Sequence, residues 1–130
     1  MKEIKLRKVN LEKAKAIINE IKEIGELKGT ILANRNGDLI AENLGKEFDT
    51  KNFAAMCASV LESAEQLGQD VHDQKIGKII AELKNGQIII IRECRSEIFF
   101  SFVLEKYSKV EKIFKNLEKF CKEILIKKDI

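Results

Sequence analysis

The sequence predicts an α/β sandwich in which a five-stranded antiparallel sheet lies between helices, in the chain order α-β-β-α-β-β-β-α. Three observations support this prediction. Apolar residues recur at helical spacing in three segments, near the start, the middle and the end of the chain. Two Asn-Gly pairs each separate two aliphatic runs, a strong hairpin signal. The apolar runs 88–91 and 98–100 do not alternate with polar residues, so both faces of these strands must be covered.

The first two helices have recognisable end signals. Asn10 is a suitable N-cap for the first helix, and Gly25 is expected just beyond its last turn. The second helix should begin at Asp49 or Thr50, which are both good capping residues, and Gly68 should end it.

The strands are expected in two hairpins and a returning strand. Turns are predicted around the Asn-Gly pairs and just before residue 97. The five expected strands are Lys28–Asn34, Asp38–Asn43, Lys75–Leu83, Gln87–Glu93 and Glu97–Leu104.

The last helix should open with Ser108 and Glu111 as a capping box and continue with a broad apolar face. The first and last helices carry nearly all of the helical lysines, which favours placing them together on one face of the sheet. The second helix is then expected alone on the other face.

Length and charge narrow the possible functions. The 130 residues contain no proline and no Gly/Ser-rich linker, so residues 1–130 are expected to form a single domain. The formal net charge of +3 is too small to indicate a nucleic-acid binder. The apolar runs are far shorter than the roughly 18 residues that span a bilayer, and residues 1–10 lack the apolar core of a secretory signal. We therefore expect a cytoplasmic protein without a membrane span.

The residues most often used in catalysis or metal binding are sparse. Cys57, Cys94 and Cys121 lie far apart in apolar runs and are expected to be buried thiols. His72 lies between aspartates in a polar turn, but this turn has no second cluster of ligands, so we expect a solvated loop. The sequence contains no phosphate-binding loop or nucleophile elbow. We expect no catalytic residue, no cofactor and no metal site.

The second helix carries two stripes at helical spacing. The first stripe is large and apolar and is expected to face the core: Phe53, Met56, Cys57, Val60, Leu61 and Leu67. The second consists of Ala55, Ser59 and Ser63, with Ala54 and Ala58 beside it. Such small residues let another helix approach closely, although alanine is also simply a good helix former.

The strand Lys75–Leu83 has no proline, bulge signal or inward charge to protect it if it lies at a sheet edge. Pairing of this strand and of the second helix between two copies would give a two-fold homodimer. The expected interface residues are Ala55, Ala58, Ser59, Glu62, Ser63, Ile76, Lys78 and Ile80.

The chain resembles the Roadblock or dynein-light-chain family in its MglB-like archaeal or bacterial form, and the resemblance runs nearly end to end. The segments that carry it are 29–34, 36–41, 53–61 and 64–68, together with the strand pair around Asn85-Gly86. The resemblance implies a profilin-like or longin-like fold. It also implies a homodimer or heterodimer that binds or regulates a small Ras-like GTPase, or that scaffolds a motor or signalling complex.

Within such a dimer, Glu62, Glu65 and Gln66 are expected on the outward face that binds the partner. An acidic face would favour a GTPase with basic residues around its switch segments. Arg35 and Arg95 fall at predicted turn tips, but we expect neither to act as an arginine finger.

The alternative is a protein that binds nucleic acid or an anionic surface through the Lys-rich first and last helices. Single-strand binding requires exposed aromatic residues for stacking. The available residues are Tyr107, Phe114 and Phe120, and the two phenylalanines fall on the apolar stripe of the last helix. We therefore expect nucleic-acid binding to be unlikely.

Overall fold

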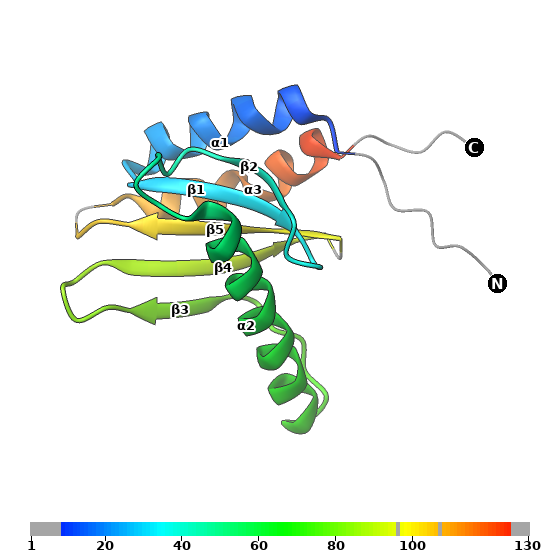
Figure 1. The fold of residues 1–130 in the computed structure, drawn as a ribbon. Helices are drawn as coiled ribbons and strands as arrows, with labels where there is room; N and C mark the ends of the chain where they lie inside the picture. Colours follow the sequence, from blue (N-terminus) through cyan, green and yellow to red (C-terminus); the bar gives the residue numbers. More distant parts are fainter. Residues whose placement is uncertain (1–8, 96, 107, 126–130) are drawn as a thin grey trace, which may run out of the picture.

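The computed structural model describes residues 9–95, 97–106 and 108–125. The expectations for the amino-terminal segment and for Tyr107 as a stacking residue lie outside the described residues. The elements are α1 (Leu11–Gly25), β1 (Gly29–Asn34), β2 (Leu39–Glu42), α2 (Thr50–Asp70), β3 (Ile79–Glu82), β4 (Ile88–Cys94), β5 (Ile98–Leu104) and α3 (Val110–Ile124). Their order confirms the prediction. The strands form one antiparallel sheet in the order β2-β1-β5-β4-β3 (Figure 1).

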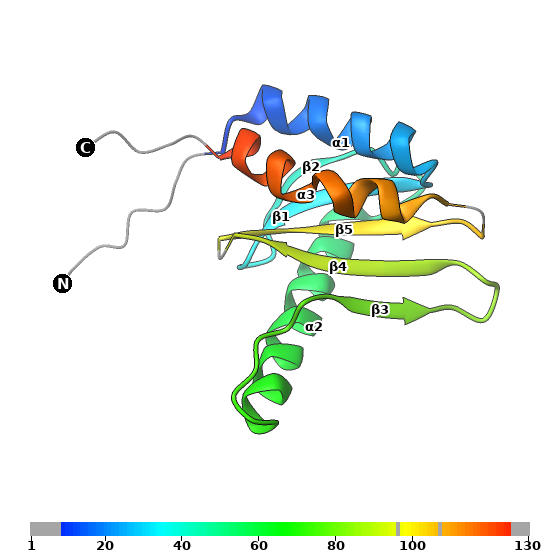
Figure 2. The same cartoon turned by 180° about the vertical axis from the view of Figure 1, so that it is seen from behind.

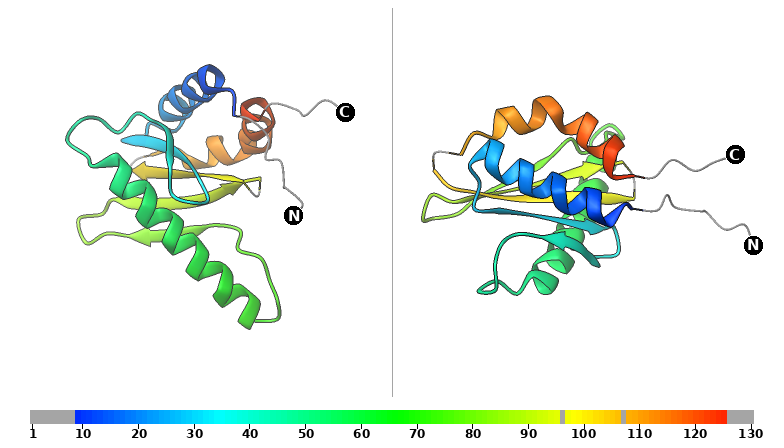
Figure 3. Two further views of the ribbon diagram at one scale, coloured as in Figure 1. Left: turned by 45° about the vertical axis from the view of Figure 1, so that its right-hand side comes forward. Right: turned by 90° about the horizontal axis from the view of Figure 1, so that it is seen from above.

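The helices divide between the two faces of the sheet as predicted. α1 and α3 lie side by side on one face, and α2 lies alone on the other (Figures 2 and 3). β5 is the central strand, and all seven of its residues are buried. Alternate side chains of β5 enter the two cores, with Phe100 and Phe102 facing α1 and α3, and Phe99 and Val103 facing α2. A strand that is apolar on both faces therefore joins the two cores.

Both predicted N-caps are confirmed. The backbone N–H of Lys13 donates to Asn10 Oδ1 (3.1 Å), and the N–H of Asn52 donates to Asp49 Oδ1 (3.2 Å). The predicted end of the first helix is wrong, because the left-handed residue is Glu26 (φ 53°) and Gly25 is still helical. Gly25 is needed for another reason: a Cβ at this position would collide with the side chain of Ile113 on α3.

The predicted capping box of the last helix is also wrong. α3 begins after Lys109 and has no side-chain cap. Ser108 Oγ instead accepts from the N–H of Glu105 (2.9 Å) and donates to the carbonyl of Glu26 (3.1 Å). Lys109 forms an ion pair with Glu26 at 2.8 Å. The start of α3 is therefore attached to the end of α1, a contact that local sequence does not reveal.

Two of the three cysteines are not thiols. Cys94, at the end of β4, and Cys121, on α3, form a disulfide with a Cα–Cα distance of 5.6 Å. The expectation of three buried thiols therefore holds only for Cys57. Cys57 Sγ donates to Ser101 Oγ at 3.4 Å. Burial raises the pKa of the Cys57 thiol, which keeps it protonated and unreactive at neutral pH.

This arrangement predicts the thiol content of protein purified without reductant. Denatured protein should titrate one thiol per chain with a chromogenic disulfide reagent, and three after reduction. The folded protein should react slowly, because Cys57 is buried. Cys57→Ser is the matched control and should titrate none before reduction. Three thiols in denatured, unreduced wild-type protein would contradict the disulfide.

Candidate protein-interaction surface

Only the first part of α2 is covered by the sheet. Ala54, Cys57, Ala58 and Leu61 are buried against the sheet. The helix crosses the strands steeply, and its carboxyl-terminal part extends beyond the edge strand β3 (Figures 1 and 2). An unusually long part of a 21-residue helix is thereby presented to solvent.

The exposed part of α2 has an apolar flank. Met56 is 59% exposed, Val60 45% and Leu67 65%. The prediction that these three residues face the core is therefore wrong, although Cys57 and Leu61 do face it. The two sets have similar helical spacing, and the position of α2 on the sheet decides which set is buried.

This flank continues into the sheet edge. A shallow depression of about 430 Å³ is lined by Ser59, Val60, Ser63, Ala64, Leu67 and Ile79. Ile79 begins β3, so the depression joins the helix to the edge strand. Its lining consists of small and aliphatic side chains without a charge, which is unusual on a chain with 35% charged residues.

The small residues of α2 also serve a purpose within the chain. The β1–β2 turn packs onto the helix at Gly37 (φ 93°), where a Cβ would lie 3.0 Å from the Cα of Ala55. Ala58 is 6% exposed and belongs to the core of its own chain, so it offers almost no surface to a partner. Ser59 and Ser63 remain exposed.

The predicted edge strand is shorter than expected. β3 covers only Ile79–Glu82, so Ile76 and Lys78 lie outside it. The preceding segment runs back along α2, because the N–H of Gln74 donates to the carbonyl of Gly68 at 2.7 Å. Gly68 does not end the helix, which continues to Asp70. Gly68 instead provides room for the segment that runs back along α2.

β3 is an edge strand, and most of it is open to solvent. It pairs with β4 on one side, and its residues from Ile80 to Glu82 are exposed. Ile80 alone is 56% exposed. The unpaired side of β3 presents backbone donors and acceptors next to the apolar flank of α2.

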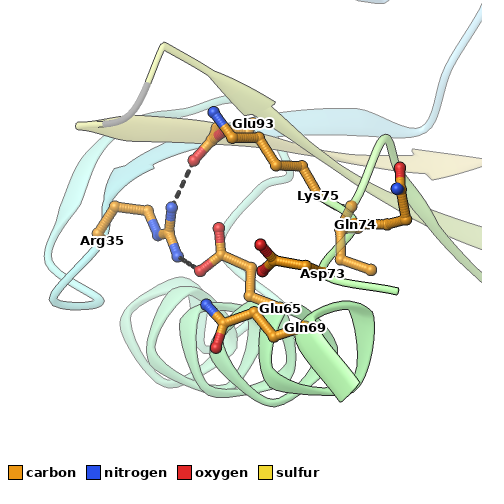
Figure 4. A pocket seen from close by; sticks show the side chains of 8 residues that line it. Arg35, Glu65, Gln69, Asp73, Gln74, Lys75 and Glu93 are labelled. Atoms are coloured by element: carbon orange, nitrogen blue, oxygen red, sulfur yellow. Dashed lines mark hydrogen bonds and ion pairs between the residues drawn. The ribbon is translucent and has the colours of Figure 1, made fainter. Parts of the chain in front are cut away.

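Arg35 connects three elements, which are the end of β1, the helix α2 and the strand β4. It lies after β1, where its Nη1 donates to Glu93 Oε2 of β4 at 2.5 Å and its Nη2 donates to Glu65 Oε1 of α2 (Figure 4). Glu62 Oε1 is 4.0 Å from the same Nη2. We call Arg35, Glu65 and Glu93 the arginine clamp. It borders a depression of about 340 Å³ that is also lined by the segment returning from α2.

The charged groups of the clamp shift one another's pKa values. Burial raises the pKa of Glu93, and the carboxylate of Glu65 adds to this rise, while Arg35 and Lys75 oppose it. Burial lowers the pKa of Arg35, but the hydrogen bond to Glu65 and the surrounding carboxylates outweigh this effect and raise it overall. Arg35 therefore stays charged and holds two carboxylates together.

A family model described as the Roadblock/LC7 domain matches residues 13–99 of the chain. The chain belongs to the Roadblock/LC7 domain family. The family resemblance seen in the sequence is thereby confirmed. A comparison of the sequence with curated proteins found no match.

Solved structures of MglB have the same fold as this Roadblock domain. MglB of Myxococcus xanthus is 15% identical with a TM-score of 0.78, covering 88% of this chain and 93% of that chain. The gliding protein MglB of Thermus thermophilus is 15% identical with a TM-score of 0.77, covering 94% and 99%. A further MglB structure, described as having a tetrameric arrangement, is 16% identical with a TM-score of 0.76, covering 94% and 98%.

The three predicted partner-binding residues of this Roadblock domain differ in their exposure to solvent. Glu62 and Gln66 are exposed on α2. Glu65 is half-buried and bound by Arg35, so its charge is not free for a partner. This pairing was not visible in the sequence, because residues 35 and 65 come together only when the β1–β2 turn packs on α2.

Neither arginine expected at a turn tip extends freely into solvent. Arg35 is held in the clamp, and Arg95 forms an ion pair with Glu118 of α3 at 3.4 Å. His72 is exposed, and within the described parts of the chain no three His, Cys, Asp or Glu side chains gather in a way that could hold a metal ion. Among the described residues, no helix has both the length and the apolar character needed to cross a membrane.

Two aromatic residues considered for nucleic-acid stacking are engaged in the Roadblock core. Phe120 is 2% exposed, and Phe114 is half-buried with its ring 6.3 Å from that of Phe102. Neither offers an open ring face for a base. The described residues therefore provide no observation that favours the nucleic-acid alternative.

The clamp predicts a loss of stability in Arg35→Ala. Glu65 and Glu93 would then lose the arginine that bonds to both of them, and we expect the free energy of unfolding in urea to fall by about 1–3 kcal/mol. The matched variant Arg35→Ala with Glu65→Gln should recover part of this loss, because one of the two charges is removed. Equal losses in both variants would show that the clamp does not act through charge.

The same variant should have a distinct pH dependence. The folded-state pKa of Glu93 lies above its unfolded value, so ionised Glu93 costs stability above the folded pKa, and this cost disappears as the pH falls through it. Removing Arg35 enlarges the cost at neutral pH, because Arg35 opposes the rise. The difference in unfolding free energy between wild type and Arg35→Ala should therefore be larger at about pH 7.5 than at about pH 5.

Proposed function

We propose that the protein is a cytoplasmic homodimeric platform that binds or regulates a small Ras-like GTPase and catalyses no reaction by itself. The observation that carries this proposal is the continuity between the apolar flank of α2 and the unpaired edge of β3. A helix flank and a sheet edge that meet in one depression fit a second copy of the same surface. Membership of the Roadblock family and the fold shared with MglB support this proposal.

In the proposed dimer, the two β3 strands pair across a two-fold axis, and the two α2 helices lie antiparallel beside them. Met56, Val60, Leu67 and Ile80 would lose solvent contact, and the backbone groups of both edges would be satisfied. Ser59 and Ser63 let the helices approach closely at the crossing point. The described tetrameric arrangement of an MglB structure supports self-association in proteins of this fold.

The GTPase would dock on the outward side of the paired helices, where Glu62 and Gln66 are exposed. Since Arg35 is held in the clamp and Arg95 lies beside α3, on the face of the sheet away from α2, the protein would act by positioning the switch segments of its partner. This role requires that α2 be held rigidly. The arginine clamp holds α2 from the side that faces the sheet.

The dimer proposal predicts that Val60→Arg is monomeric in light scattering at micromolar concentration, while wild type has twice the mass of one chain. The arginine would bury a charge without a partner in the interface. Ser59→Arg should have the same effect, because it forces the helices apart. The matched control is Leu11→Arg, an exposed apolar residue on α1, which should remain dimeric. A monomeric wild type, or a dimeric Val60→Arg, would refute this interface.

The docking proposal predicts that Glu62→Lys with Gln66→Lys weakens binding of the GTPase by protein that light scattering shows to be dimeric. The expected loss of affinity is about tenfold or more, because a charge is reversed at the interface. Lys115→Glu on α3 is the matched control and should bind as wild type. Unaltered binding in the double variant would refute the docking face.

The positioning proposal has a separate test in GTP turnover by the bound partner. Arg35→Ala and Arg95→Ala should each lose far less than the thousandfold or more that a missing arginine finger costs, roughly tenfold at most. A thousandfold loss in either variant, with folding intact, would contradict positioning and establish a finger.

A further inference from the structure

A third depression lies on the face of the sheet away from α2, between the end of β4 and α3, with a volume of about 300 Å³. Two arginines and the α3 surface form most of its wall: Arg92, Arg95, Phe114, Leu117, Glu118 and Cys121. We call it the α3 pocket. Neither the dimer nor the docking face uses it.

Arg92 lies over an aromatic ring. Its guanidinium carbon lies 5.5 Å from the ring centroid of Phe114, and Lys78 Nζ lies 4.9 Å from the same centroid. Among the described residues, neither cation forms an ion pair with a carboxylate. A guanidinium stacked on a ring keeps the N–H donors at its edge available for an oxyanion.

Arg95 is strained and incompletely bonded. Its φ of 62° lies in the left-handed region, which costs a non-glycine residue free energy. Its Nε is buried and has no hydrogen-bond partner in the described structure. Its one ion pair is to Glu118, whose side chain is 73% exposed and easily displaced. The side chain as a whole is 31% exposed, so its terminal N–H groups are the donors that a ligand in the pocket can reach.

The charges around the pocket favour a dianion. Among the lining residues, Arg92 and Arg95 are positive and Glu118 is negative. Glu93 also borders the pocket, but its carboxylate is bound by Arg35 on the other face of the sheet at 2.5 Å. Once Glu118 is displaced, the two positive charges of the arginines match a phosphate monoester, which carries nearly two negative charges at pH 7. Phe114 and Leu117 also line the pocket, so part of its wall is apolar.

We propose that the α3 pocket binds the phosphate group of a small phosphorylated ligand, with Arg92 and Arg95 donating to its oxygens and Glu118 displaced toward solvent. The volume is at the lower end of ligand pockets, which fits a phosphate with a small substituent. The bound phosphate would connect β4 to α3 beside the Cys94–Cys121 disulfide.

The test is a titration of ¹⁵N-labelled protein with inorganic phosphate and, separately, with phenyl phosphate, at constant ionic strength maintained with chloride. The arginine Nε–H resonance of Arg95 reports directly on the buried donor. We expect saturable shifts of Arg92 and Arg95 with both probes. Tighter binding of phenyl phosphate would identify an organic phosphate as the ligand, whereas equal binding would identify free phosphate.

Three variants make the test specific. Arg92→Gln with Arg95→Gln should weaken binding about tenfold or more, because two charge-assisted hydrogen bonds are lost. Glu118→Gln should tighten binding several-fold, because it removes the competing carboxylate at an exposed position that tolerates substitution. Lys115→Gln is the matched control for loss of a lysine charge on α3 and should bind within about twofold of wild type.

Absence of a saturable shift in wild type, or equal weakening by Lys115→Gln and the arginine variant, would overturn the proposal. Unchanged or weaker binding by Glu118→Gln would also overturn it, and this variant does not depend on the folding of the arginine variant. The outcome is independent of the dimer, because the pocket lies on the face of the sheet away from α2.

Discussion

The central strand β5 imposes the constraint on which the rest of the structure depends. Its side chains are apolar on both faces and all of its residues are buried, so each face of the sheet requires a cover. Three helices must provide two covers, and α1 and α3 together form one of them. α2 is left to cover the other face alone, and a single helix cannot cover five strands. The exposed edge β3 and the exposed apolar flank of α2 both follow from this unequal division.

The arginine clamp determines how α2 meets the sheet. Arg35 holds a glutamate on α2 and a glutamate on β4, while the β1–β2 turn packs against the small residues near the start of the helix. These contacts lie on the side of α2 that faces the sheet, so they hold the helix without occupying its apolar flank. A rigid helix with one free flank is suited to a docking platform.

The opposite face of the sheet is held together differently. Gly25 allows α1 and α3 to come into close contact, Ser108 bonds the start of α3 to the end of α1, and the disulfide joins α3 to β4. The positively charged pocket lies where the last of these attachments meets the sheet. Arg92 is on β4, and Arg95 directly follows Cys94, the disulfide-linked end of that strand.

Local sequence was sufficient for much of the architecture. The caps at Asn10 and Asp49, the Asn-Gly turns, the element order and the division of helices between the two faces were all predicted, because each depends on residues close in the chain or on apolar content alone. The dimer interface remains a prediction of the same kind, since it rests on exposed residues of α2 and β3. Domain extent over residues 1–130 likewise remains a prediction.

The tertiary structure decided which residues are buried and which are paired, because the local sequence pattern left both ambiguous. The large apolar stripe of α2 spans more than one side of the helix, and only the crossing of α2 over the sheet buries Cys57 and Leu61 while exposing Val60 and Leu67. The partners of Glu65 and Cys94 lie 30 and 27 residues away, so no periodicity could reveal them. The physical reason is the same in each case. Helical spacing and residue type depend on neighbours along the chain, whereas burial, ion pairing and disulfide pairing depend on which elements the sheet brings together.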